Sequence, residues 1–395
     1  MTDPQKQTDG HIEDSSNYET TESDAVKLGK KALKAKPWLF NRCHFAARGF
    51  FFELRQNDKV HPEYYSVHCV DGAGSKLFLT AWSGNYSLQP TDALAMNAND
   101  MATAIHAYPD TLNLYFAIQK GAALHMGEIM GGFANALEKI KIKNAPFDVN
   151  IGKIETASLD EVVSLGVPNL GWDVGVALTG YIKKNEMPLL EPKPRHIIVG
   201  VSSTGLHSNG YTSARHALLT EDYEYREEWK KQYHGKFRLE DKPLLLQGKT
   251  LLEALQAPTA LYLSEALEIG RKFDSREIYG VNITGNGLGN FNRVGDCISF
   301  EITDPLEPLG IHKLLVEESK LMPEETYTKY NMGMGFAYIV PSQDIAEKIV
   351  NLINSIGENK AKIIGEVWKS NNPKLTTIMH KPYEGPKLTF EGYYG

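Results

Sequence analysis

The stretch VSSTGLHSNGY, residues 201–211, lies just past the middle of the chain and indicates how the C-terminal half is built. It follows the apolar run of residues 197–200, which predicts a buried strand, and it precedes residues 212–219, which predict a helix. A strand, a loop with two glycines and a helix start together present backbone N–H groups to an anion. The same layout also occurs in an ordinary strand-to-helix turn with an Asn-Gly corner. This stretch alone therefore does not establish an anion site, and the other motifs of the chain have to be considered with it.

The composition is that of a globular protein with more than one domain. The 395 residues are 42% hydrophobic and 23% charged, which fits two or three domains. A net charge of −7 argues against a broad nucleic-acid surface. The three cysteines are isolated, so they predict neither a disulfide framework nor a zinc site and fit a reducing compartment. No apolar run approaches the roughly 18 residues that span a bilayer. We expect a cytoplasmic protein that binds neither nucleic acid nor membrane.

A proline-rich stretch divides the chain. Residues 186–195 contain three prolines among mixed charges, and they predict a linker between a domain of residues 25–185 and one of residues 196–395. Residues 1–24 are polar and acidic, which predicts a tail or a loosely held lid. Strand-like and helix-like segments alternate on both sides of the linker. This alternation predicts two α/β or α+β domains.

The individual elements follow from apolar runs, periodicity and breakers. Strands are expected over residues 65–70, 111–118, 173–182, 197–200, 277–284, 297–302, 334–340 and 361–367. Helices are expected over residues 91–105, 122–141, 212–219, 249–272 with an interruption near Pro258, 312–319 and 344–356. Residues 221–242 form a charged segment that predicts a surface insertion.

Oxygen-bearing side chains gather at strand ends and along the first long helix. They are Asp71, Asp92, Asn99, Asp100 and Glu155. Hard oxygen ligands without a His or Cys cluster suit Mg²⁺, which takes one or two carboxylates and completes its shell with water and phosphates. Asp92 and Asn99 are seven residues apart, so a helix places them on one face. Taken singly, each of these residues is more often a cap or an ion-pair partner.

The segment DGAGSK, residues 71–76, is a candidate phosphate contact. Two glycines and a lysine follow a predicted strand, and an aspartate stands beside them to hold a metal. The order of residues is not that of a Walker A loop. Neither a Gly-x-Ser-x-Gly elbow nor a dinucleotide-binding fingerprint occurs. His207, in the loop of residues 201–211, is either a general acid or base or a polar loop residue.

Nine short motifs follow one another in the chain: DGAGSKL (71–77), AMNAND (95–100), ETA (155–157), GLHSNGY (205–211), LQAPT (255–259), ITGNGL (283–288), NFNRV (290–294), YNMGMG (330–335) and IGE (364–366). In this order, over roughly residues 60–368, they resemble the phosphoribosylformylglycinamidine cyclo-ligase family, also called the aminoimidazole ribonucleotide synthetases.

The resemblance implies a two-domain α+β subunit. Its N-terminal domain would pair with that of a second copy into a shared β-barrel, which makes a homodimer, and its C-terminal domain would be a mixed sheet with helices on one side. ATP and Mg²⁺ would lie between the domains. The implied reaction is the ATP-dependent ring closure of formylglycinamidine ribonucleotide to aminoimidazole ribonucleotide in purine biosynthesis, with release of ADP and phosphate.

The resemblance also implies roles for single residues. The implied Mg²⁺ ligands are Asp71, Asp92, Asp100 and Glu155. The implied nucleotide contacts are Asp71, Gly72, Gly74, Lys76 and Asn99, with Lys76 neutralising phosphate charge. Gly285, Gly287 and Arg293 are implied on the ribose phosphate side of the substrate. His207, Ser208 and Asn209 are implied at the reacting formyl group, where His207 would transfer a proton or stabilise the developing oxyanion.

Three motifs depart from the family pattern and leave the substrate open. Residues 152–160 lack a second glutamate and a Met-Pro-Gly turn, residues 284–287 carry an Asn between two glycines, and residues 293–296 read RVGD in place of RVLP. One alternative is another ATP-dependent member of the superfamily with a different phosphorylated substrate. The other is a non-catalytic dimeric paralogue, against which the clustered carboxylates argue, because like charges repel without a metal.

Overall fold

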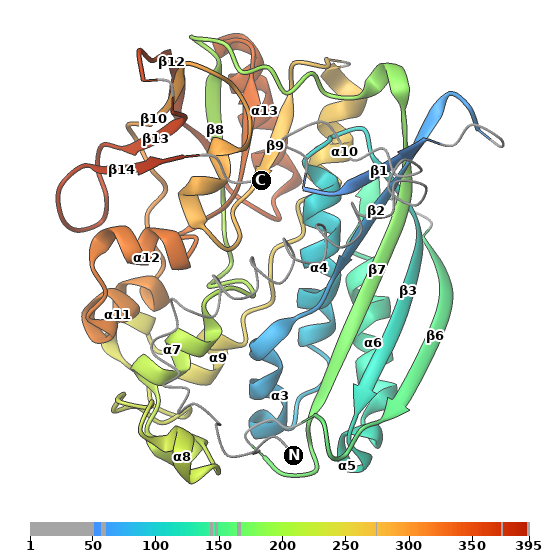
Figure 1. The fold of residues 1–395 in the computed structure, drawn as a ribbon, viewed down its shortest axis with the longest axis vertical. Coiled ribbons are helices and arrows are strands. Elements are labelled where there is room, and N and C mark those ends of the chain that lie inside the picture. Colours follow the sequence, from blue (N-terminus) through green and yellow to red (C-terminus); the bar gives the residue numbers. More distant parts are fainter. Residues whose placement is uncertain are drawn as a thin grey trace, which may run out of the picture. The chain divides into compact units, whose positions relative to one another are not determined.

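The computed structural model describes residues 51–56, 61–142, 145–146, 149–163, 167–273, 275–372 and 374–392. All of them belong to one compact unit, which contains two large β-sheets (Figure 1). The expected tail or lid of residues 1–24 lies outside the described residues.

The first sheet has five strands in the order β1-β2-β7-β3-β6. Neighbouring strands are antiparallel, except that β3 and β6 are parallel. The strands are β1 (Glu53–Gln56), β2 (Tyr64–Asp71), β7 (Trp172–Lys183), β3 (Tyr108–Ile118) and β6 (Asn150–Ser158). The apolar runs predicted β2, β3 and β7 within three residues at either end.

Two helices cover one face of this sheet. They are α4 (Gln89–Ala102), which packs on β2 and β7, and α6 (Met126–Leu137), which packs on α4 (Figure 1). Buried and more exposed residues alternate along β7, as the period of two for strand side chains requires. Large side chains also lie exposed on this sheet, including Val70, which is 76% exposed, and Tyr115, which is 49% exposed.

The second sheet has seven strands in the order β14-β13-β10-β12-β8-β11-β9. It is mixed, as expected, because β10 and β13 are parallel while the other pairs are antiparallel. The strands are β8 (Ile197–Ser202), β9 (Tyr279–Asn282), β10 (Ile298–Ile302), β11 (Met334–Val340), β12 (Ala361–Lys369), β13 (Thr376–Met379) and β14 (Leu388–Glu391).

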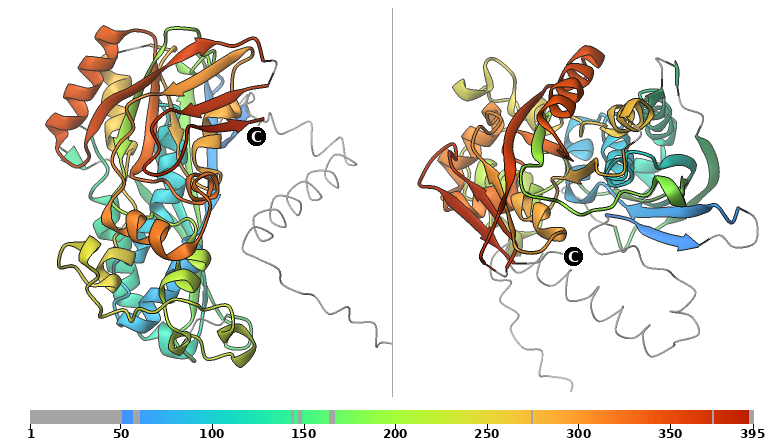
Figure 2. Two further views of the ribbon diagram at one scale, coloured as in Figure 1. Left: turned by 90° about the vertical axis from the view of Figure 1, so that its left-hand side faces the viewer. Right: turned by 90° about the horizontal axis from the view of Figure 1, so that it is seen from above.

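Both faces of the central strands β8 and β11 are buried. On one face lies α13 (Gln343–Ile356), the red helix beside the red and orange strands in Figure 2. This is the helical layer expected on one side. The opposite face is covered too, because Ile198 and Ile339 belong to a second hydrophobic cluster that includes Leu218 and Leu314.

Shorter helices lie between successive strands of each sheet. They are α3 (Phe78–Ser83), α5 (Lys120–Ala123), α7 (Tyr211–Leu218), α8 (Glu227–Lys230), α9 (Leu251–Leu255), α10 (Leu263–Phe273), α11 (Gly310–Ser319) and α12 (Pro323–Lys329). The helix expected over residues 249–272 is two helices, because residues 256–262 around Pro258 are not helical.

The strands of the five-stranded sheet all precede residue 184, and those of the seven-stranded sheet all follow residue 196. Residues 187–196 carry neither helix nor strand. The boundaries of the two expected domains stay a prediction. None of the described helices combines the length and apolar character needed to cross a membrane.

Candidate active site

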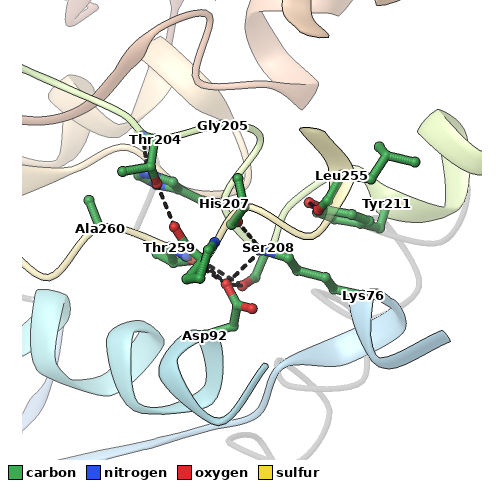
Figure 3. A network of polar contacts seen from close by, with 12 residues as sticks. Lys76, Asp92, Thr204, Gly205, His207, Ser208, Tyr211, Leu255, Thr259 and Ala260 are labelled. Atoms are coloured by element: carbon green, nitrogen blue, oxygen red, sulfur yellow. Dashed lines mark hydrogen bonds and ion pairs between the residues drawn. The ribbon is translucent and has the colours of Figure 1, made fainter. Parts of the chain in front are cut away.

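A buried ion pair joins two of the motifs at the centre of the site. Lys76 lies in the 3₁₀ helix η1 (Gly74–Leu77), and its Nζ is 2.7 Å from Oδ1 of Asp92 on α4 (Figure 3). Both side chains are fully buried, and Nζ also donates to the carbonyl oxygen of Ala257 at 2.6 Å. Burial lowers the pKa of Lys76, and Asp92 opposes that shift. Since a buried charge is costly without a partner, each member of this pair depends on the other.

The segment of residues 257–262, between α9 and α10, is held against α4 by two side chains of that helix. Thr259 donates its N–H and its hydroxyl to Asp92 Oδ1, at 2.8 and 2.5 Å. Seven residues along α4, Asn99 donates to the Ala260 carbonyl at 2.8 Å and accepts from the Tyr262 N–H at 2.9 Å. Asp92 and Asn99 therefore share one helix face, as their spacing predicted. We call Lys76, Asp92, Thr259, Ser208 and His207 the Lys76–Asp92 network.

The loop after β8 brings Ser208 to the same carboxylate. Ser208 Oγ lies 3.1 Å from Thr259 Oγ1 and 3.5 Å from Asp92 Oδ1 (Figure 3). One oxygen of Asp92 therefore gathers a lysine, a threonine and a serine from three segments. Its other oxygen, Oδ2, is buried and has no hydrogen-bond partner among the described residues.

His207 is a strained and buried residue of this loop. Its φ is 60°, a value that residues other than glycine rarely adopt, and it is only 3% exposed. Nε2 accepts a long hydrogen bond of 3.4 Å from the Thr204 N–H. A Cβ atom at Gly335 would overlap the His207 ring and the Tyr262 hydroxyl, so the glycine in the YNMGMG motif makes room for both.

The imidazole of His207 is neutral at physiological pH. Burial, together with smaller effects of the positive charge of Lys76 and of the neighbouring His312, lowers its pKa to about 3. Because Nε2 accepts the Thr204 N–H, the single proton of the neutral ring lies on Nδ1. His207 can therefore offer a neutral N–H donor without first taking up a proton.

A second polar cluster lies two turns further along α4. Asp100 accepts from Asn282 Nδ2 at 2.8 Å. The pKa of Asp100 is raised to about 7, mainly by burial and further by Asp71 at the end of β2, against the opposing effects of Asn282 and Arg293. Two carboxylates that repel each other would be stabilised by a cation. We call Asp71 and Asp100 the acid pair.

The glycine loop after β9 is organised around one amide. Asn290 donates to the carbonyl oxygens of Gly285 and Gly287, at 2.8 and 2.9 Å, and its Oδ1 accepts from Nε and Nη2 of Arg293, each at 3.2 Å. A Cβ at Gly287, whose φ is 50°, would overlap the Tyr327 carbonyl oxygen. The structure thus brings Gly285, Gly287 and Arg293 together, and the electrostatic effect of Arg293 on Asp100 links them to the acid pair.

The other predicted residues lie in separate places. Gly72 donates its N–H to Asp71 Oδ1 at 2.7 Å, and Gly74 has a φ of 60° at the start of η1. Asn209 is half-buried beside Ser208. Glu155 is exposed on the strand β6, where its partner is Lys153 at 2.9 Å.

Some residues of the site were not singled out from the sequence. Thr259 closes the LQAPT motif, so that motif was an available signal for it. Tyr262 and Asn282 lie outside the quoted motifs. Their partners on α4, Asn99 and Asp100, are 163 and 182 residues away in the sequence.

Acidification is expected to destabilise the protein partly through His312, which is fully buried beside this loop. Burial lowers its pKa to about 4, below the unfolded value of 6.5, so the unfolded state takes up the proton first as the pH falls through 6.5. Between pH 7 and pH 4, wild type should lose about 3 kcal/mol relative to His312→Gln. Urea unfolding at both pH values measures this difference, in which the other histidines cancel. An equal stability gap at pH 7 and pH 4 would contradict the prediction.

No protein-family model matches the chain. Among curated proteins, the phosphoribosylformylglycinamidine cyclo-ligase of Methanococcus maripaludis strain C7 is 30% identical over 334 residues, which are 83% of this chain and 86% of that protein. The protein of the same name from Methanococcoides burtonii is 32% identical over 312 residues, 78% of this chain and 81% of that protein.

Solved structures with the same fold are more distant in sequence. A chain of the HypE–HypF complex superposes with a TM-score of 0.51 at 14% identity, over 86% of this chain and 92% of that chain. AaThiL in complex with AMPPCP and TMP gives a TM-score of 0.50 at 12% identity, over 92% and 95% of the two chains. At these identities the likeness shows the α+β fold and nothing more.

Proposed function

Because the chain belongs to the phosphoribosylformylglycinamidine cyclo-ligase family, we propose that it closes the imidazole ring of formylglycinamidine ribonucleotide with consumption of ATP, releasing ADP and phosphate. Family membership makes the protein an enzyme of the ligase class, and it confirms the resemblance drawn from the nine motifs. The product would be aminoimidazole ribonucleotide, an intermediate of purine biosynthesis. A non-catalytic paralogue is not favoured.

The Lys76–Asp92 network is the observation that carries the proposal. It joins the DGAGSKL, GLHSNGY and LQAPT motifs and α4 in one buried hydrogen-bonded cluster, although these segments are up to 183 residues apart. Phosphoryl transfer requires mainly that reactants be positioned and that charge be neutralised. A fixed lysine and two hydroxyls around one carboxylate, with the neutral imidazole of His207 next to Ser208 in the loop, are suited to that task.

The acid pair fits one Mg²⁺ ion better than the full set of four predicted ligands does. In the described part of the chain, no group of three or more His, Cys, Asp or Glu side chains is placed so that it could hold a metal ion. Mg²⁺ needs only one or two carboxylates when phosphates and water complete its shell. Asp71 and Asp100 would supply these two carboxylates. The roles of Asp92 and Glu155 as ligands stay predictions, and Asp92 would act through its contact with Lys76.

ATP, with Mg²⁺, would supply the phosphoryl group that activates the formyl oxygen before the amidine nitrogen attacks. The chain's own residues would orient the reactants. Gly72 and Gly74 would face the phosphates, and the buried Lys76 would contribute positive charge from beneath the same segment. The loop with Asn290 and Arg293 would face the ribose phosphate of the substrate. His207, Ser208 and Asn209 would lie at the formyl group.

A homodimer is part of the proposal. The strand β6 is an edge of the five-stranded sheet, and its residues are exposed along nearly its whole length, including Ile151 and Ile154, each 43% exposed. An exposed edge strand with apolar side chains is a template for pairing with another strand. A second copy of the same sheet would cover it and complete the barrel that the resemblance implies.

An assay with Mg-ATP and formylglycinamidine ribonucleotide tests the proposal. ADP release is measured alongside the formation of aminoimidazole ribonucleotide, and equal amounts of both are expected. ATP binding without the imidazole product would instead indicate a different substrate, with attention to the altered motifs at residues 152–160 and 284–287.

Asp100→Asn is expected to reduce ATP turnover by at least about 100-fold while leaving the fold and the oligomer intact. The asparagine keeps an oxygen that accepts from Asn282, but it removes the charge that Mg²⁺ requires. Turnover is measured at saturating Mg²⁺, and size-exclusion chromatography reports the oligomer. Asp344→Asn, which changes an exposed carboxyl group on α13, serves as the control. Unchanged turnover in Asp100→Asn would remove the acid pair from the reaction.

A further inference from the structure

Glu265 is a buried carboxyl group that the reaction described above does not use. It lies in the first turn of α10 and is 1% exposed. Its Oε1 accepts from Asn359 Nδ2 at 2.6 Å, whereas Oε2 is buried and has no hydrogen-bond partner among the described residues. Burying a carboxyl group is costly, and here the cost is only partly offset. The contribution of Glu265 therefore depends on the residues that its hydrogen bond to Asn359 holds in place.

Glu265 is connected to the loop of His207 through a short chain of hydrogen bonds. Asn359 is followed by Lys360, whose N–H donates to Ser202 Oγ at 3.0 Å. In return, the Ser202 N–H donates to the Lys360 carbonyl oxygen at 2.7 Å. Ser202 is the last residue of β8, and the loop of residues 203–210 starts directly after it. The position of Asn359 therefore bears on where that loop begins.

The same end of α10 holds Ser202 a second time. Tyr262 precedes Glu265 by three residues, and its hydroxyl donates to the Ser202 carbonyl oxygen at 2.8 Å. The Tyr262 ring also lies near the His207 ring, with centroids 6.1 Å apart. Residues three apart at a helix start lie on one face. Tyr262 thus binds Ser202 directly, and Glu265 is connected to Ser202 through Asn359 and Lys360.

We propose that Glu265 is a positioning residue of the reaction, because its hydrogen bond to Asn359 fixes Ser202 and so the backbone of the loop that carries His207. The kinetic consequence rests on the proposed function, whereas the effect on the loop does not. Glutamine is a close replacement for this carboxyl group, since burial and the nearby Glu358 raise the pKa of Glu265 to about 7, with Asn359 opposing the shift. The other titratable groups that interact with it are Tyr262 and Tyr338.

The experiment compares Glu265→Leu, Glu265→Gln and a matched control, Glu268→Leu. Glu268 lies one turn further along α10 and pairs with Arg271 at 2.6 Å. Hydrogen exchange of peptides covering residues 202–211 is measured in each full-length protein, together with kcat and the KM for ATP. Glu265→Leu should exchange faster in these peptides and lose about 10- to 100-fold in kcat, with KM changed less than about threefold. Glu265→Gln should recover kcat to within about threefold of wild type, because it keeps the acceptor for Asn359.

Asn359→Ala is the second variant, because it cuts the same connection without altering α10. It should reproduce the changes in exchange and kcat, and the double variant with Glu265→Leu should be no worse than either single one. Equal exchange at residues 202–211 in Glu265→Leu and Glu268→Leu, or a Glu265→Gln protein as slow as Glu265→Leu, would overturn the proposal. If wild type forms no aminoimidazole ribonucleotide, the proposed function fails, but hydrogen exchange still decides whether Glu265 positions the loop.

Discussion

Lys76→Met is expected to destabilise the protein by about 3–5 kcal/mol and to stop turnover, because it leaves Asp92 as a buried charge without its partner. The side chain of Lys76 is fully enclosed, and its Nζ is bound by Asp92 and by the Ala257 carbonyl oxygen, so no water replaces it. Urea unfolding at a fixed protein concentration measures the stability, and ADP release measures the turnover.

The control for this prediction is Lys348→Met on α13. Lys348 pairs with Asp344 at 2.6 Å, but 60% of the lysine side chain and 71% of the aspartate side chain are exposed. Exposed pairs of this kind contribute about 0–1 kcal/mol. The double variant of Lys76→Met with Asp92→Leu should recover part of the lost stability, since it removes both buried charges, although it stays inactive. Similar unfolding midpoints for Lys76→Met and Lys348→Met would show that the buried pair does not stabilise the fold.

Much of the fold could be predicted because many of its strands are visible in the sequence as short apolar runs. The run IIVG at residues 197–200 is apolar at every position, and the structure has it in β8, buried on both faces. The four-residue strands β13 and β14 were not predicted, because so short a segment carries little periodicity. The long helix expected over residues 249–272 is interrupted from residue 256 to residue 262, where Thr259 and Tyr262 bind α4 instead of continuing a helix. Such tertiary contacts cannot be read from propensity.

The sequence motifs predicted which residues belong to the site, but they did not predict which of these residues contact one another. Lys76, Asp92, His207 and Ser208 were all named from the sequence, and the structure places them in one network. The predicted acidic residues fall into two groups, because Asp92 is in a buried ion pair and Asp71 and Asp100 form the acid pair. This division depends on burial, which the sequence does not show. Asp92 and Asp100 look alike as residues of one acidic helix, yet Lys76 neutralises the first, and the second has its pKa raised to about 7.

The burial of His207 bears on the two roles proposed for it at the formyl group, proton transfer and stabilisation of the oxyanion. A general acid or base works best when its pKa lies near the working pH. The pKa of His207 is lowered to about 3, so its protonated form is scarce at neutral pH. A neutral Nδ1–H can still donate a hydrogen bond to an oxygen that gains negative charge. The structure therefore favours stabilisation of the oxyanion over proton transfer.

His207→Ala is accordingly expected to slow ring closure by about 100- to 1,000-fold, the usual effect of removing one such donor, with ATP affinity changed by less than about threefold. Single-turnover formation of aminoimidazole ribonucleotide and equilibrium ATP binding measure the two quantities. His207→Gly is the matched control, because glycine tolerates the φ of 60° at this position and separates loss of the imidazole from backbone strain. Both variants should be equally slow.

In wild type, no ionisation of His207 should appear in the rate between pH 5 and pH 9, because the ring is neutral throughout. A rate that falls with the titration of a group near pH 6.5, and that loses this titration in His207→Ala, would instead make His207 the proton-transfer residue.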